Sequence, residues 1–160
     1  MATWMRRADE YFSAPWALVI YQPILYLFLF GATIRLWVND SEPPEFKAFI
    51  AEHFYGIWLI LGVCSPLLAA LAWFLIMRRS GRKRFLGMWL RLASDIGVAT
   101  VLLSYHAVTS WLAPVETEQA IFSRYMCGAA LVFVASLIIR DVWTLVVTER
   151  LAGLIHKAAR

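Results

Sequence analysis

The chain has 160 residues, of which 61% are apolar or aromatic and 16% are charged, whereas about 25% of residues are charged in an ordinary soluble domain. Its mean hydropathy is +0.65, and a soluble domain of about 150 residues buries only about 70% of its unfolded surface, too little to cover this much apolar content. Two cysteines exclude a disulfide-rich secreted scaffold. The composition therefore indicates an integral membrane protein.

Four apolar stretches are long enough to cross the hydrocarbon layer of a bilayer, which takes about 20 helical residues. They cover residues 15–38, 54–77, 88–112 and 125–147. The alternation typical of a transmembrane barrel is absent from the sequence. We predict an all-α, polytopic four-transmembrane-helix bundle that forms one domain over residues 1–147. Residues 148–160 place apolar and charged residues on opposite faces of a helix, which predicts a cytoplasmic amphipathic helical tail.

The distribution of basic residues predicts the orientation in the membrane. Segments 1–13, 78–84 and 148–160 together hold ten basic and three acidic residues, whereas segments 39–53 and 113–124 hold two basic and six acidic residues. Short basic loops remain in the cytoplasm. The pattern therefore predicts cytoplasmic amino and carboxyl termini, and we expect the protein in a bacterial inner membrane.

The loop between the second and third spans carries a cluster of basic residues, namely Arg78, Arg79, Arg82, Lys83 and Arg84. Such a cluster sets topology and contacts anionic lipid, at about 1 kcal/mol per charge. Nucleic acid is not an expected partner, because the short loops offer no domain that could present these residues to it.

Small residues form one stripe on the third span at helical spacing: Ala93, Gly97, Thr100, Ser104 and Ala107. In lipid, small residues allow two helices to approach closely, and this packing is a main source of helix association. The stripe predicts a helix-packing surface, either inside the bundle or at a contact between subunits.

Charged residues inside the third and fourth spans predict an ion-pair cluster of Arg91, Asp95, Arg140 and Asp141. Asp95 and Arg140 are expected at the same depth, about 10 Å below the inner surface, given the helical rise per residue. We therefore predict an ion pair between Asp95 and Arg140, with Arg91 and Asp141 completing the cluster. A structural role is favoured over a proton relay, because His106 lies about 16 Å farther along the helix.

Two histidines suggest a redox alternative, in which His53 and His106 bind a haem or a metal ion between two helices. The predicted depths disfavour it, since His53 lies just outside its span and His106 about 9 Å inside its own. Motifs for thiol redox, serine hydrolysis and zinc hydrolysis are also missing from the sequence. The sequence therefore predicts a protein with no cofactor and no enzymatic activity.

The predicted function is that of a membrane subunit or scaffold whose partners are the lipid bilayer and other membrane subunits or copies of itself. The alternatives are a holin-like pore or ion-conducting channel, and a haem- or quinone-binding redox subunit.

Overall fold

The computed structural model describes residues 15–39, 52–77, 81–112 and 118–158, and these form helices without strands. The four long helices are α2 (Pro15–Val38), α4 (Glu52–Ile76), α5 (Gly81–Ala107) and α6 (Glu118–Ala158). A π-helical turn, Val108–Leu112, continues α5. All four helices are long and apolar enough to cross a membrane. The predicted all-α, membrane-spanning fold is therefore confirmed.

The third helix begins earlier than the hydropathy of the sequence predicts. Helix α5 starts at Gly81 rather than at residue 88, so Arg82, Lys83 and Arg84 lie exposed in its first turns and not in a loop. Arginine and lysine are good helix formers, and a hydropathy criterion ends a span at charged residues even where the helix continues. Arg78 and Arg79 lie outside the described residues.

The fourth helix is much longer than a single span. Helix α6 is continuous over 41 residues, or about 60 Å at the rise of an α-helix. The predicted helical tail, residues 148–160, therefore continues the fourth span along the same axis up to Ala158. Its sequence contains no proline that would end the helix after the membrane crossing.

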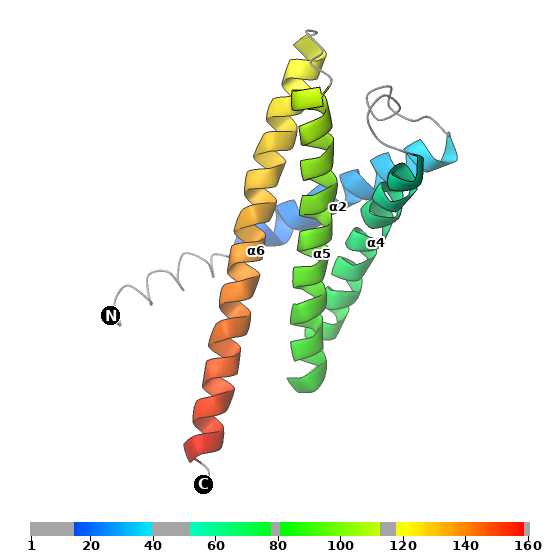
Figure 1. The fold of residues 1–160 in the computed structure, drawn as a ribbon. Helices are drawn as coiled ribbons and strands as arrows, with labels where there is room; N and C mark the ends of the chain where they lie inside the picture. Colours follow the sequence, from blue (N-terminus) through cyan, green and yellow to red (C-terminus); the bar gives the residue numbers. More distant parts are fainter. Residues whose placement is uncertain (1–14, 40–51, 78–80, 113–117, 159–160) are drawn as a thin grey trace.

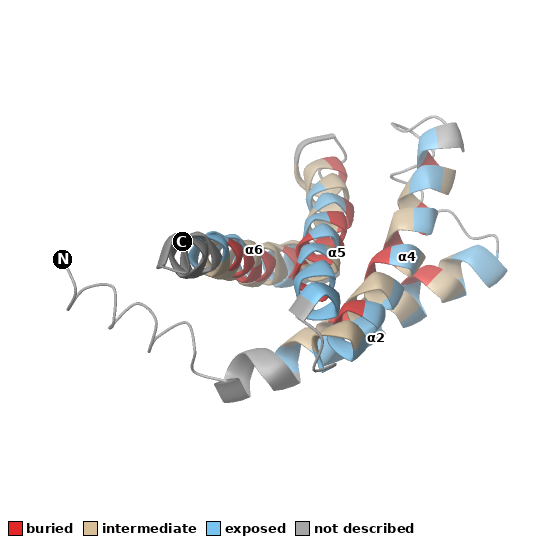
Figure 2. Ribbon diagram, turned by 90° about the horizontal axis from the view of Figure 1, so that it is seen from below, coloured by how far each residue is buried: buried red, intermediate tan, exposed pale blue. Residues whose placement is uncertain are grey.

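Helices α5 and α6 run side by side in opposite directions, and α4 packs against α5 (Figure 1). Figure 2 shows α5 and α6 nearly end-on but α2 from the side, so α2 crosses the other helices obliquely. The buried residues lie mainly where α5 faces α4 and α6. This arrangement brings the middle of α2 close to the middle of α5.

Glycines set the close approach of α4 and α5. A Cβ atom at Gly87 would lie 2.9 Å from the carbonyl oxygen of Ala72, and a Cβ atom at Gly97 would collide with the side chain of Ser65. The hydroxyl of Ser94 crosses the same interface and donates a hydrogen bond of 2.6 Å to the Ser65 carbonyl oxygen. Close backbone contact and a short interhelical hydrogen bond are the means by which helices associate in lipid.

Candidate functional site: an intramembrane polar cluster

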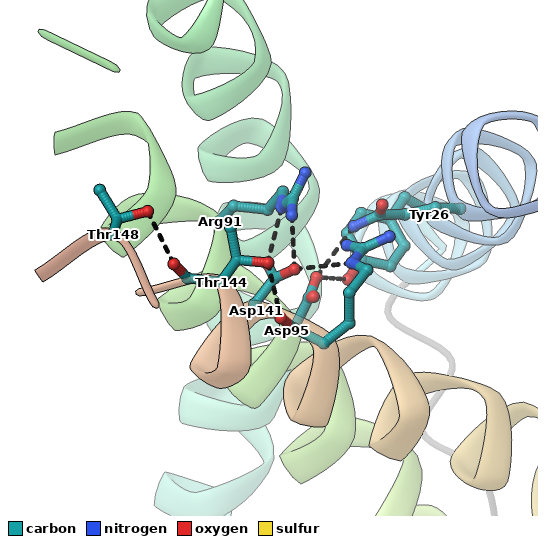
Figure 3. A network of polar contacts seen from close by, with 8 residues as sticks. Tyr26, Arg91, Asp95, Asp141, Thr144 and Thr148 are labelled. Carbon is teal, nitrogen blue, oxygen red and sulfur yellow. Dashed lines mark hydrogen bonds and ion pairs between the residues drawn. The ribbon is translucent and has the colours of Figure 1, made fainter. Parts of the chain in front are cut away.

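Polar side chains from α2, α5 and α6 meet halfway along the bundle (Figure 3). We call this group the polar cluster; its members are Gln22, Tyr26, Arg91, Asp95, Arg140 and Asp141. Charged groups are costly inside the hydrocarbon layer, so they occur there mainly in pairs or at functional sites. The cluster is therefore the candidate functional site of the protein.

Asp141 is the centre of the ionic part of the cluster. Its side chain is 2% exposed and accepts two hydrogen bonds from Arg91, 2.6 Å from Nε and 2.5 Å from Nη2. This bidentate geometry is the one that the planar guanidinium group favours with a carboxylate. Arg140 Nε also donates to Asp141, over 2.8 Å. One carboxylate thus pairs with two arginines and joins α5 to α6.

Asp95 is the centre of the second part and joins α2 to α5. Its side chain is fully buried, and its Oδ1 atom accepts hydrogen bonds from Gln22 Nε2, at 3.0 Å, and from the hydroxyl of Tyr26. Both neighbours donate, which is the arrangement that an ionised carboxylate requires. The Asp95 Oδ2 atom and the Arg140 Nη2 atom are buried and find no hydrogen-bond partner among the described residues.

The four charged residues come together, but their pairing differs from the prediction. Among the described residues, the ion pairs join Asp141 to Arg91 and to Arg140, and none joins Asp95 to Arg140. Arg91 and Asp95 lie one turn apart on one face of α5, where Arg91 bonds to Asp141 of α6 and Asp95 accepts hydrogen bonds from α2. The early start of α5 also places Asp95 near the middle of its helix rather than near one end.

Sequence analysis did not assign Gln22 and Tyr26 to the cluster. A signal was present, because the two residues stand four positions apart and therefore share one face of a helix. Their partner could not be chosen from the sequence, since the oblique path of α2 decides which helix this face meets.

The surroundings of the cluster are those of a structural network. Thr144 and Thr148 donate to carbonyl oxygens of their own helix, over 2.8 and 2.7 Å, and so complete no path between the charged groups. Towards His106, the next buried residues on α5 are Val98 and Val101, at 0% and 1% exposure. The buried side of α5 is apolar there, which favours a static role for the charges.

The small-residue stripe is only partly covered by the chain itself. Gly97 is buried against α4, but Ala93 and Thr100 are exposed, and Ser104 and Ala107 are half-buried. The expectation that protein covers both faces of this helix is therefore not met within one chain. On α5, Asp95 contacts α2 and Arg91 contacts α6, whereas Gly97 is the member of the stripe that packs against α4.

The two histidines predicted as haem or metal ligands, His53 and His106, lie on different helices. His53 lies in the first turn of α4, and its side chain is outside the described part of the structure. His106 is half-buried in the last turn of α5, beside α6. Among the described residues, three potential ligands of one metal ion do not gather at any point.

Comparison of the chain with protein-family models, with curated proteins and with solved structures found no match.

Proposed function

We propose that the protein is a non-enzymatic integral membrane subunit that associates, through the exposed face of α5, with a second copy or with a helix of another membrane subunit. The observation that carries the proposal is this face itself. It presents Ala93 and Thr100 together with the larger Ile96 and Leu103, all exposed in the single chain. Small and large side chains in alternation form hollows and ridges that a neighbouring helix can fill.

The hydroxyl groups of this face do not oppose its burial. Thr100 donates to the carbonyl oxygen of Ile96 over 2.9 Å, and Ser104 donates to that of Thr100 over 2.5 Å. Both hydroxyls are thus satisfied within α5, and a partner helix could cover them without leaving a polar group unpaired. The polar cluster supports the same function, because it ties three helices into one rigid subunit.

A photoreactive residue at position 100 tests the association in living cells. With Thr100→benzoylphenylalanine, we expect one discrete crosslinked product after illumination, at the mass of a dimer or of a complex with one other membrane protein. The matched control is Ile139→benzoylphenylalanine, since Ile139 is exposed on α6, away from this face, and we expect no discrete product from it. Equal crosslinking at both positions, or none at position 100, would contradict the proposal.

The charge distribution supports cytoplasmic termini in a bacterial inner membrane. The exposed Arg82, Lys83 and Arg84 stand at the start of α5, and the carboxyl-terminal end of α6 continues into further basic residues on the same side of the predicted topology.

Reporter fusions in a bacterial host test this orientation. A green fluorescent protein fused after Arg160 should fluoresce, and alkaline phosphatase inserted after residue 45 should be active, because that enzyme requires the periplasm. Phosphatase activity from a fusion at Arg160 would refute the proposed orientation.

A further inference from the structure

Two buried atoms of the polar cluster, one on α5 and one on α6, have hydrogen-bonding capacity that the chain does not use. Asp95 Oδ2 and Arg140 Nη2 are both buried, and neither has a hydrogen-bond partner in the part of the protein that the structure describes. The Asp95 side chain is fully buried, and that of Arg140 is 12% exposed. Buried polar atoms are nearly always hydrogen-bonded in folded proteins, because an unpaired one costs its full desolvation energy. Each of the two atoms therefore needs a partner inside the cluster.

The two atoms belong to side chains that meet around Asp141. Arg140 Nε and Arg91 Nη2 donate to the same oxygen of Asp141, Oδ1. Asp95 lies one turn from Arg91 on the same face of α5, and Figure 3 shows the Asp95 and Asp141 side chains next to each other. The charge of Arg140 is close enough to attract the Asp95 carboxylate, although the two described side chains form no ion pair. One small group between Asp95 and Arg140 could therefore reach both atoms.

The chemistry of the two atoms determines the kind of ligand. A carboxylate oxygen only accepts hydrogen bonds and a guanidinium nitrogen only donates them, so the ligand must donate to Asp95 Oδ2 and accept from Arg140 Nη2. The cluster contains two aspartates and two arginines, whose charges cancel when all four are ionised. An added cation would be repelled by the arginines, and an added anion by the carboxylates. A small neutral molecule that both donates and accepts meets these conditions, and water is the smallest.

We propose that the polar cluster binds one water molecule, which donates a hydrogen bond to Asp95 Oδ2 and accepts one from Arg140 Nη2. Buried waters in proteins make about two to four such bonds, to polar groups that have no other partner. The water joins the two parts of the cluster, because Gln22 and Tyr26 of α2 hold Asp95, while Arg140 holds Asp141. The hydrogen-bond network then runs without interruption across α2, α5 and α6.

Water-edited solid-state NMR of the full chain in lipid bilayers tests the proposal, since it follows magnetisation from water to single carboxyl carbons. We expect the Asp95 carboxyl carbon to receive magnetisation faster than that of Asp141, although both side chains are buried. Asp141 is the matched reference because it accepts hydrogen bonds from Arg91 and from the same guanidinium of Arg140, so it reports any transfer relayed through arginine protons. Transfer to Asp95 that is no faster than transfer to Asp141 would overturn the proposal.

Two variants test whether Arg140 anchors the water. Arg140→Met retains a long unbranched side chain but cannot donate a hydrogen bond, and we expect the fast transfer to Asp95 to be lost. The matched control is Thr144→Val, one turn away on α6. Thr144 donates only to the Arg140 carbonyl oxygen of its own helix, so its replacement should leave the transfer unchanged. Equal loss in both variants, or loss in neither, would count against the water site.

A distance measurement in the unchanged protein keeps the test independent of any variant's folding. Carbon–nitrogen dipolar recoupling between the Asp95 carboxyl carbon and the Arg140 guanidinium nitrogens distinguishes a water bridge from a direct ion pair. Two hydrogen bonds in series separate Asp95 Oδ2 from Arg140 Nη2 by roughly 4.5–5.5 Å, whereas a direct pair brings these atoms to about 2.8 Å. A direct pair, or a separation too long for one water to span, would refute the proposed site.

Discussion

The substitution Asp141→Asn is expected to lower the free energy of unfolding by about 3–5 kcal/mol, the cost of leaving a buried charge without its partner. A large loss of stability is expected because the Asp141 carboxylate pairs with both Arg91 and Arg140, and an asparagine would neutralise neither charge. Equilibrium unfolding of the detergent-solubilised protein by increasing fractions of dodecyl sulfate, followed by circular dichroism, measures the loss.

Two comparisons identify the source of that loss. Glu149→Gln removes an exposed acid from the same helix and should change stability by less than about 0.5 kcal/mol. Adding Arg91→Met to Asp141→Asn should restore part of the stability, because it removes one of the two uncompensated charges. If Asp141→Asn unfolds as easily as Glu149→Gln does, Asp141 is not the centre of the network.

The second large effect is expected at Gly87, where alanine should destabilise the protein by about 1–3 kcal/mol through overpacking. The new Cβ atom would lie 2.9 Å from the Ala72 carbonyl oxygen and 3.0 Å from the Ile76 amide nitrogen. Backbone atoms cannot rotate away as a side chain can, so α4 and α5 would have to separate. The same unfolding assay measures this loss.

Gly31 provides the matched control on a different helix. A Cβ atom there would meet nothing within 4 Å, so Gly31→Ala should stabilise α2 by up to about 1 kcal/mol through the higher helix propensity of alanine. A loss of stability in Gly87→Ala together with a gain in Gly31→Ala would establish that close contact of α4 and α5 holds the bundle together. A loss of similar size at both would show instead that glycine matters here for reasons other than interhelical distance.

Hydropathy was sufficient to predict the four long helices among the described residues and the bounds of α2, because an apolar run can be read directly from the order of the residues. It failed at the start of α5, since Arg82, Lys83 and Arg84 are polar but also strong helix formers. At the end of α6 it was the amphipathic pattern of residues 148–160, and not hydropathy, that predicted the helix beyond the apolar run, and α6 continues to Ala158. Helix ends follow backbone preferences, which hydropathy does not measure.

The candidate site, like the fold, could be predicted from the sequence only in part. The sequence placed Arg91, Asp95, Arg140 and Asp141 in one cluster, because positions along antiparallel helices can be counted from their ends. It could not assign the partners within the cluster, since these depend on how each helix is rotated and on the oblique crossing of α2. Tyr26 and Gln22 are near Asp95 for that reason alone.

The length of α6 has a consequence for whatever meets the carboxyl end of this protein. A rod of about 60 Å exceeds the full thickness of a bilayer with its headgroups, about 40–45 Å. Even after a complete crossing, roughly 15 Å of stiff helix remains to stand clear of the lipid. In the orientation proposed above, this end of α6 would project from the cytoplasmic surface, and a tilt imposed on it would be transmitted along the helix to Arg140 and Asp141.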